Sequence, residues 1–278
     1  MNGRWIIENL QSALDTWNGK LAEIWQLLTL PPQEFRDGTV WAVISSIHEG
    51  LKAIGYALLV LFFAAGAVRA GASLAETRRP EPVIRTFLRF SLAKAAITYG
   101  MDIMLSLMSV VQGVIAAVMS ASGFTGAVQI SLPETVAKAV EDCGFFESIP
   151  LWCMTLIGGI FMLAESFVLI FSVYGRFFRI YMFTAAAPIP LASFAGEGTS
   201  AMGRSFLRSF VSACLEGAVI VLACAIFSAY AGSPPEIASD ATPVSAVWSY
   251  ITQTVFNMLV LTGAVRMSDR VAREISGM

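Results

Sequence analysis

Three carboxylates inside long apolar runs are the residues of this sequence whose positions most suggest chemistry. Asp102, Glu165 and Glu216 each lie in a different run. A carboxylate at the centre of a membrane-spanning helix costs about 2.5–3.5 kcal/mol on insertion scales, so it usually faces other helices or water. We therefore expect these acids either to line a pore, a gate or a path for protons or cations, or to join helices as protonated or hydrogen-bonded groups. Both interpretations stay open.

Other residue types give little support for catalysis or metal binding. The single histidine, His48, excludes a site with several histidine ligands and argues against a catalytic triad. The four cysteines form no Cys-x-x-Cys pair, and a disulfide between Cys143 and Cys153 is the one pairing left open. We expect no catalytic residue, no metal and no cofactor, so the chain is predicted not to be an enzyme.

The composition predicts an integral membrane protein. Of the 278 residues, 56% are hydrophobic and 14% are charged, whereas soluble domains contain about 25% charged residues. The mean hydropathy is +0.69. The net charge of −2 excludes a protein that binds nucleic acid through an overall positive charge. We expect an all-α bundle of helices that cross a membrane.

Five apolar segments are long enough to cross a bilayer, which requires about 20 mostly apolar residues. A further apolar segment, residues 177–195, contains Pro188 and Pro190, which break or kink a helix. It is either a sixth span or a re-entrant segment that returns to the side from which it came. The five spans lie near residues 51–68, 95–119, 149–174, 209–230 and 244–265.

The distribution of Lys and Arg distinguishes these two topologies. With five spans and the N-terminus outside, 13 of the 18 basic residues lie inside, whereas six spans place only 8 inside. Short cytoplasmic loops are enriched in basic residues. We therefore predict five spans in the cytoplasmic membrane, an outside N-terminus, a cytoplasmic C-terminus and a re-entrant proline segment.

The N-terminal residues predict an amphipathic helix outside the membrane. Apolar residues recur at alternating spacings of three and four, as in a helix-packing seam. The opposite face is mainly acidic, which argues against binding to anionic lipid. We expect packing against protein, including neighbouring copies, with association with the membrane as the alternative. Residues 1–40 would form this element and residues 41–278 the polytopic domain. The seam comprises Ile7, Leu10, Leu14, Trp17, Leu21, Ile24 and Leu28.

Basic residues in the inside segments are candidates for docking a cytoplasmic partner. The strongest cluster lies between residues 69 and 94. The general excess of basic residues on the inside explains most of it, and contact with a secretion partner or a nucleic-acid backbone is the functional alternative. The candidate docking residues are Arg78, Arg79, Arg85, Arg89, Lys94, Arg176 and Arg179.

Three stretches carry a resemblance to a known family. They are WIIENLQSALDTWNGKLAEIWQLLT, RRPEPVIRTFLRFSLAKAAITYGMDIM and RFFRIYMFTAAAPIPLASFAGEG. They resemble the TrbL-like polytopic channel subunits of type IV secretion systems, in particular those of Gram-positive conjugative elements. The resemblance implies a role in conjugative DNA transfer without enzymatic activity. It also implies a closed ring of about five identical copies, beside a secretion ATPase and other membrane subunits.

Two functions of other classes stay open at this point. A transporter coupled to protons or cations would use Asp102, Glu165 and Glu216, and would lose uptake when these acids are neutralised. A non-conducting membrane scaffold would tolerate their neutralisation, but it would fail to assemble when the N-terminal seam is broken.

Overall fold

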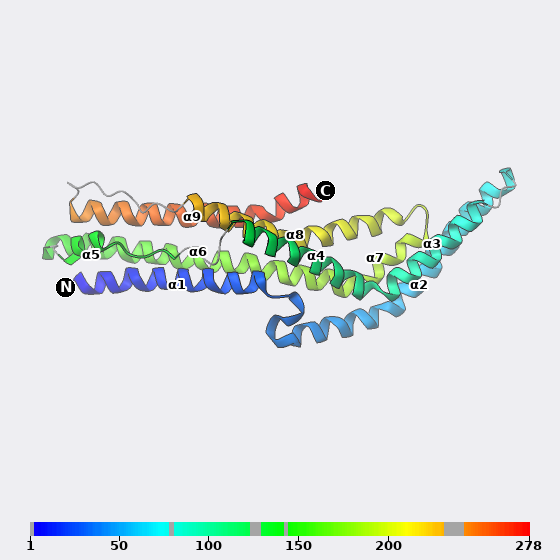
Figure 1. The fold of residues 1–278 in the computed structure, drawn as a ribbon, viewed down its shortest axis with the longest axis horizontal. Coiled ribbons are helices and arrows are strands. Elements are labelled where there is room, and N and C mark those ends of the chain that lie inside the picture. Colours follow the sequence, from blue (N-terminus) through cyan, green and yellow to red (C-terminus); the bar gives the residue numbers. More distant parts are fainter. Residues whose placement is uncertain (1–2, 78–80, 123–128, 142–143, 231–241) are drawn as a thin grey trace. The chain divides into compact units, whose positions relative to one another are not determined.

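The computed structural model describes residues 3–77, 81–122, 129–141, 144–230 and 242–278. These residues form helices and no strand, which confirms the all-α prediction. Cys143 lies outside the described residues, so its pairing with Cys153 is not described. In chain order, the elements are α1 (Gly3–Thr29), η1 (Pro32–Gly38), α2 (Thr39–Thr77), α3 (Glu81–Thr98), α4 (Gly100–Ser122), α5 (Glu134–Glu141), α6 (Phe145–Ala186), α7 (Pro188–Ala192), η2 (Ser193–Ala195), α8 (Ser200–Tyr230) and α9 (Pro243–Ile275), as Figure 1 shows.

Five helical segments of the described residues are long and apolar enough to cross a membrane. The chain is therefore a multi-pass membrane protein, as the sequence predicts. Each candidate segment is longer than the corresponding predicted apolar run or extends beyond it, because a helix continues past the membrane wherever no residue breaks it. The segments are Pro32–Arg69, Gly100–Ser122, Ser148–Ala186, Ser200–Tyr230 and Val244–Ile275.

Helix α6 differs most from the sequence-based boundaries. We expected a span to end near Tyr174 and a separate proline segment to begin at residue 177, but α6 continues without interruption to Ala186. Arginines mark the end of an apolar run, yet they are good helix formers and do not end a helix. The helix ends just before Pro188, which begins the short helix α7. Only the second half of the predicted re-entrant segment therefore departs from α6.

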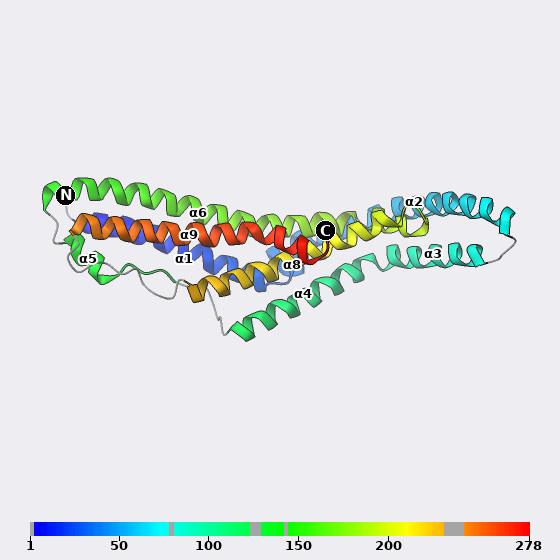
Figure 2. The same cartoon turned by 90° about the horizontal axis from the view of Figure 1, so that it is seen from above.

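The described residues fall into two compact units, and the first contains residues 1–29, 115–174 and 219–268. Here α1 lies along α6 (Figures 1 and 2). Trp5 stacks on Trp152 of α6 with ring centroids 5.8 Å apart. The amide side chain of Asn18 donates to the Ile130 carbonyl (2.9 Å) and accepts from the Ile130 backbone N–H (3.0 Å). These contacts fix the amphipathic helix within its own unit.

The second unit contains residues 30–114, 175–218 and 269–278. In it α2 and α3 run side by side (Figure 2). Both contact the part of the chain that follows α6, residues 187–199, which we call the proline segment from here on. Gly55 of α2 lies so close to Pro188 that a Cβ would come within 2.8 Å of the proline carbonyl oxygen. On the other side, Arg89 of α3 forms a 2.8 Å ion pair with Glu197. The proline segment is thus held between two helices of the same unit.

Candidate functional site

A cluster of charged side chains joins α6, α8 and the end of α9 in the second unit. Arg179 Nη1 donates to Glu216 Oε2 at 3.1 Å, and it also donates to Asp269 Oδ1. Asp269 Oδ2 accepts from Arg273 Nη2, one turn later on α9, at 2.5 Å. The Glu216 side chain is only 7% exposed. The contribution of such ion pairs to stability depends strongly on their geometry, because each buried charge loses its hydration.

Arg176 lies one turn before Arg179 on α6, and it is more deeply buried. The residue is 3% exposed, and its guanidinium carbon lies 5.5 Å from the centre of the Phe177 ring. Gly217 of α8 packs directly against it, since a Cβ there would stand 2.3 Å from that guanidinium carbon. Arg176 Nε and Nη1 are buried and have no hydrogen-bond partner among the described residues. We call Arg176, Arg179, Glu216, Asp269 and Arg273 the charge cluster.

The three predicted acids lie in different surroundings. Glu216 is paired in the charge cluster, whereas Asp102, in the first turn of α4, is exposed. Among the described residues of the second unit, no ion pair or hydrogen bond links these two acids. Glu165 belongs to the first unit, where its Oε2 is buried without a hydrogen-bond partner among the described residues. Nowhere in the described chain do three potential metal ligands gather.

Helix α4 has two contrasting faces around Asp102. Met104, Met108 and Val111 are buried. At about 100° per residue, the opposite side of the helix carries Asp102, Ser106, Ser109 and Gly113, and all four are exposed. We call these four residues the α4 polar face. Only Asp102 was singled out from the sequence, although the spacings of four, three and four among these small or polar residues were visible there.

The serines of the α4 polar face satisfy their hydroxyl groups within the helix. Ser106 donates to the Asp102 carbonyl at 2.8 Å, and Ser109 donates to the Ser106 carbonyl at 2.9 Å. Their side chains therefore need no partner from another helix. The Asp102 carboxylate, by contrast, forms no ion pair with any described residue, so it must find water or another protein.

The chain matches the model of one family, described as TrbL/VirB6 plasmid conjugal transfer like protein, over residues 17–188. The matched region is more than half of the chain, and it includes α2, α3, α4 and α6. This chain belongs to the TrbL/VirB6 family. No curated protein and no solved structure matches the chain. As a TrbL/VirB6-like protein with five candidate spans, it is a membrane subunit of a conjugal transfer (type IV secretion) apparatus.

The predicted docking residues of this TrbL/VirB6-like chain are not equally accessible. Arg85 and Lys94 are exposed on α3, whereas Arg89 is paired with Glu197. Arg176 and Arg179 point into the charge cluster, so they do not form a free basic surface. The remaining two candidates, Arg78 and Arg79, lie outside the described residues.

The predicted oligomer seam is covered by the chain itself. Leu10, Leu14, Trp17 and Leu28 are at most 1% exposed within the first unit, Leu21 and Ile24 are buried as well, and Ile7 is half-buried. Because this face is already filled, a contact of α1 with a neighbouring copy would have to use its outer face. That the seam packs against neighbouring copies of the chain stays a prediction. The burial of the seam within the chain does not support it.

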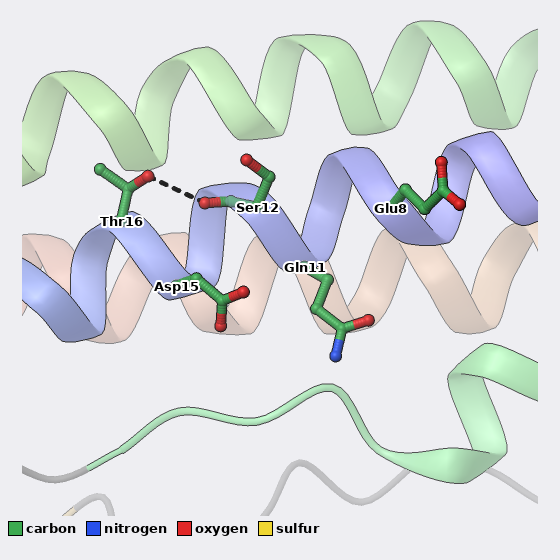
Figure 3. A pocket seen from close by; sticks show the side chains of 5 residues that line it. All are labelled: Glu8, Gln11, Ser12, Asp15 and Thr16. Atoms are coloured by element: carbon green, nitrogen blue, oxygen red, sulfur yellow. Dashed lines mark hydrogen bonds between the residues drawn. The ribbon is translucent and has the colours of Figure 1, made fainter.

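The outer face of α1 carries a shallow hollow of about 560 Å³ (Figure 3). The Thr16 hydroxyl donates to the Ser12 carbonyl at 2.9 Å, and Glu8 pairs with Arg4 at 3.4 Å. All the lining side chains stand on one face of a single helix, and no nucleophile with an adjacent base is among them, so the hollow offers no catalytic arrangement. It is lined by Glu8, Gln11, Ser12, Asp15 and Thr16.

Proposed function

We propose that the chain is a channel subunit through which DNA and its bound protein cross the cytoplasmic membrane during conjugation. The observation that carries this proposal is the α4 polar face, an exposed Asp-Ser-Ser-Gly line on a candidate span. We further propose that the N-terminus lies outside and the C-terminus in the cytoplasm, because this orientation places most basic residues inside. The subunit is proposed to act without catalytic activity of its own.

A polar face on a membrane helix requires an explanation. A carboxylate in contact with lipid is costly, so intramembrane acids usually face water or other protein. The buried side of α4 is occupied by Met104, Met108 and Val111, so Asp102 on the opposite side is not covered by that packing. Ser106 and Ser109 have small side chains and Gly113 has none, so these positions leave space for a path next to Asp102. A water-filled path lined by this face accounts for both features.

The chemistry of the face also suits a moving polyanion. Conduction requires that the lining bind its substrate weakly enough for the substrate to leave. Two hydroxyl groups attract DNA phosphates far less than arginines would, and the carboxylate repels them. A single chain presents one such face, so we propose that several copies form a closed ring around the path. A secretion ATPase and other membrane subunits would stand beside this ring.

Conjugation frequency in an in-frame deletion strain tests the proposal. Transfer should collapse in the deletion and return when the gene is restored on a plasmid. The pair Ser106→Leu and Ser109→Leu should restore transfer at least about tenfold less well, because two large apolar side chains would narrow and dry the path. Normal transfer in the deletion would refute a role in conjugation.

A control places the same leucine side chains on a different side of the same helix. Val110 and Val114 are exposed apolar residues outside the α4 polar face (65% and 39%). The pair Val110→Leu and Val114→Leu should support normal transfer at an equal amount of membrane protein. If both leucine pairs lower transfer equally, the loss comes from α4 packing, and the polar face has no role in the path.

A further inference from the structure

His48 on α2, the single histidine of the sequence, is completely buried in the second unit. Its Nδ1 lies 2.7 Å from the Thr184 carbonyl oxygen of α6, whereas its Nε2 is buried without a hydrogen-bond partner among the described residues. Because a carbonyl oxygen can only accept a hydrogen bond, the ring proton belongs on Nδ1. A second proton on Nε2 would bury a donor without an acceptor, which is unfavourable. The geometry therefore fits a neutral ring with an unprotonated Nε2.

The Thr184 carbonyl needs a partner because of a proline four residues later. In an α-helix this carbonyl would accept from the backbone N–H of residue 188, but Pro188 has no N–H. His48 supplies a donor at this place. Gly55, seven residues after His48 on the same face of α2, lies directly against Pro188. The same face of α2 therefore follows the chain across the break between α6 and α7.

The His48 ring also lies against a second helix break. Helix α3 ends at Thr98, and α4 begins at Gly100. A Cβ on Gly100 would stand 3.4 Å from His48 Cε1 and 3.5 Å from His48 Nε2. It would also stand 3.3 Å from Leu191 Cδ1 of α7. One buried ring of α2 is therefore in contact with the break between α6 and α7 and with the break between α3 and α4.

We propose that His48 is a positioning residue that holds these two helix breaks together. Its Nδ1–H takes the place of the backbone N–H that Pro188 lacks, and its ring supports the start of α4 at Gly100. Asp102, the first residue of the α4 polar face, lies two residues after Gly100, so His48 also fixes where that face begins. This last step rests on the proposed function, whereas the hydrogen bond and the packing against Gly100 do not.

The position of the ring proton can be observed directly, because the chain has one histidine. In membranes that contain the ¹⁵N-histidine-labelled chain, magnetic resonance resolves the two nitrogens of this one ring. At about pH 8, where an ordinary imidazole is neutral, Nδ1 should carry the proton and Nε2 should not. A proton on Nε2, or an equal mixture of the two tautomers, would overturn the proposal. This measurement needs no substitution, so it does not depend on the folding of a variant.

Amide hydrogen exchange tests whether the His48 bond holds the break. The Leu191 N–H donates to the Ala187 carbonyl at 3.1 Å, so its exchange reports the opening of α7. His48→Leu removes the donor and should speed this exchange about tenfold, because a lost hydrogen bond to a buried carbonyl shifts a local opening by about that factor. His48→Asn places an amide nitrogen where Nδ1 stood, so it should keep the exchange close to that of the unsubstituted chain.

The two variants are matched, since each removes the ring and only one keeps a donor. Equal acceleration of Leu191 exchange in His48→Leu and His48→Asn would overturn the proposal. Amides of α1, in the first unit, are the control and should exchange alike in all three chains. Neither measurement involves DNA transfer. Normal transfer in the deletion strain would therefore refute the proposed channel without refuting the role of His48 at the helix breaks.

Discussion

The two units of the chain bury different kinds of side chain. In the first unit, α1 buries an apolar seam, and beside it Tyr174 donates to Glu23 at 3.0 Å. In the second unit, carboxylates and guanidinium groups are buried between helices, and Arg176 keeps donors without a hydrogen-bond partner among the described residues. Apolar side chains that fill a space favour one arrangement. A charged group that lies near several partners can instead exchange one partner for another.

The largest effect is expected from breaking the packing of the first unit. Trp17 is completely buried, so Trp17→Ala should lower the free energy of unfolding by about 3–5 kcal/mol, through lost apolar burial and a cavity. Thermal unfolding of the purified protein in detergent measures this change. Trp5→Ala is the control, because Trp5 is 45% exposed. Equal losses in the two variants would show that α1 is not held by its seam.

A smaller loss is expected when the charge cluster of the second unit is broken. Arg179→Gln leaves Glu216 and Asp269 without their shared cation, which should cost about 2–3 kcal/mol after allowance for the partial exposure of Arg179. The same thermal measurement applies, with Arg85→Gln as the control, since Arg85 is exposed on α3. An unchanged unfolding midpoint for Arg179→Gln would mean that these ion pairs do not stabilise the unit.

The smallest effects concern the contact between α2 and the proline segment. Gly55→Val would drive a side chain into Pro188 and should cost about 1–3 kcal/mol. Gly50→Ala, earlier in α2 and with open space around it, should instead stabilise the helix by about 0.5–1 kcal/mol. Limited proteolysis of membranes at the turn of residues 196–199 reports whether the segment loosens. Equal cleavage of the two variants would contradict a tight contact at Gly55.

Hydropathy and spacing predicted the elements of the fold better than their boundaries. Apolar runs of membrane length predicted the five candidate spans, and the alternating spacing predicted the amphipathic helix over α1. The predicted end of α6 was wrong, because Arg176 and Arg179 were interpreted as the edge of a span. A different signal was available in the sequence. Arg176 shares a helical face with the buried residues Phe177, Ile180 and Thr184.

The partners in the charge cluster could not be predicted from the sequence. Arg179 meets Glu216 across 37 positions and Asp269 across 90. Counts of basic residues in loops indicate the side of the membrane, but they do not indicate the direction in which a side chain points around its helix. The α4 polar face was partly predictable, since Asp102 was singled out from the sequence. The packing of the second unit was needed to see that this face lies opposite a buried one.

Labelling of single cysteines on α4 tests most directly whether this helix lines a water-filled path. Cells carrying the complete transfer apparatus would express a cysteine-free chain with Ser106→Cys, Ser109→Cys or Val110→Cys, and would be treated with a thiol reagent that does not cross membranes. Cysteines at positions 106 and 109 should react while the cysteine at 110 stays protected, because only the polar face meets water. Equal protection of all three positions, or equal reaction, would contradict the proposed path.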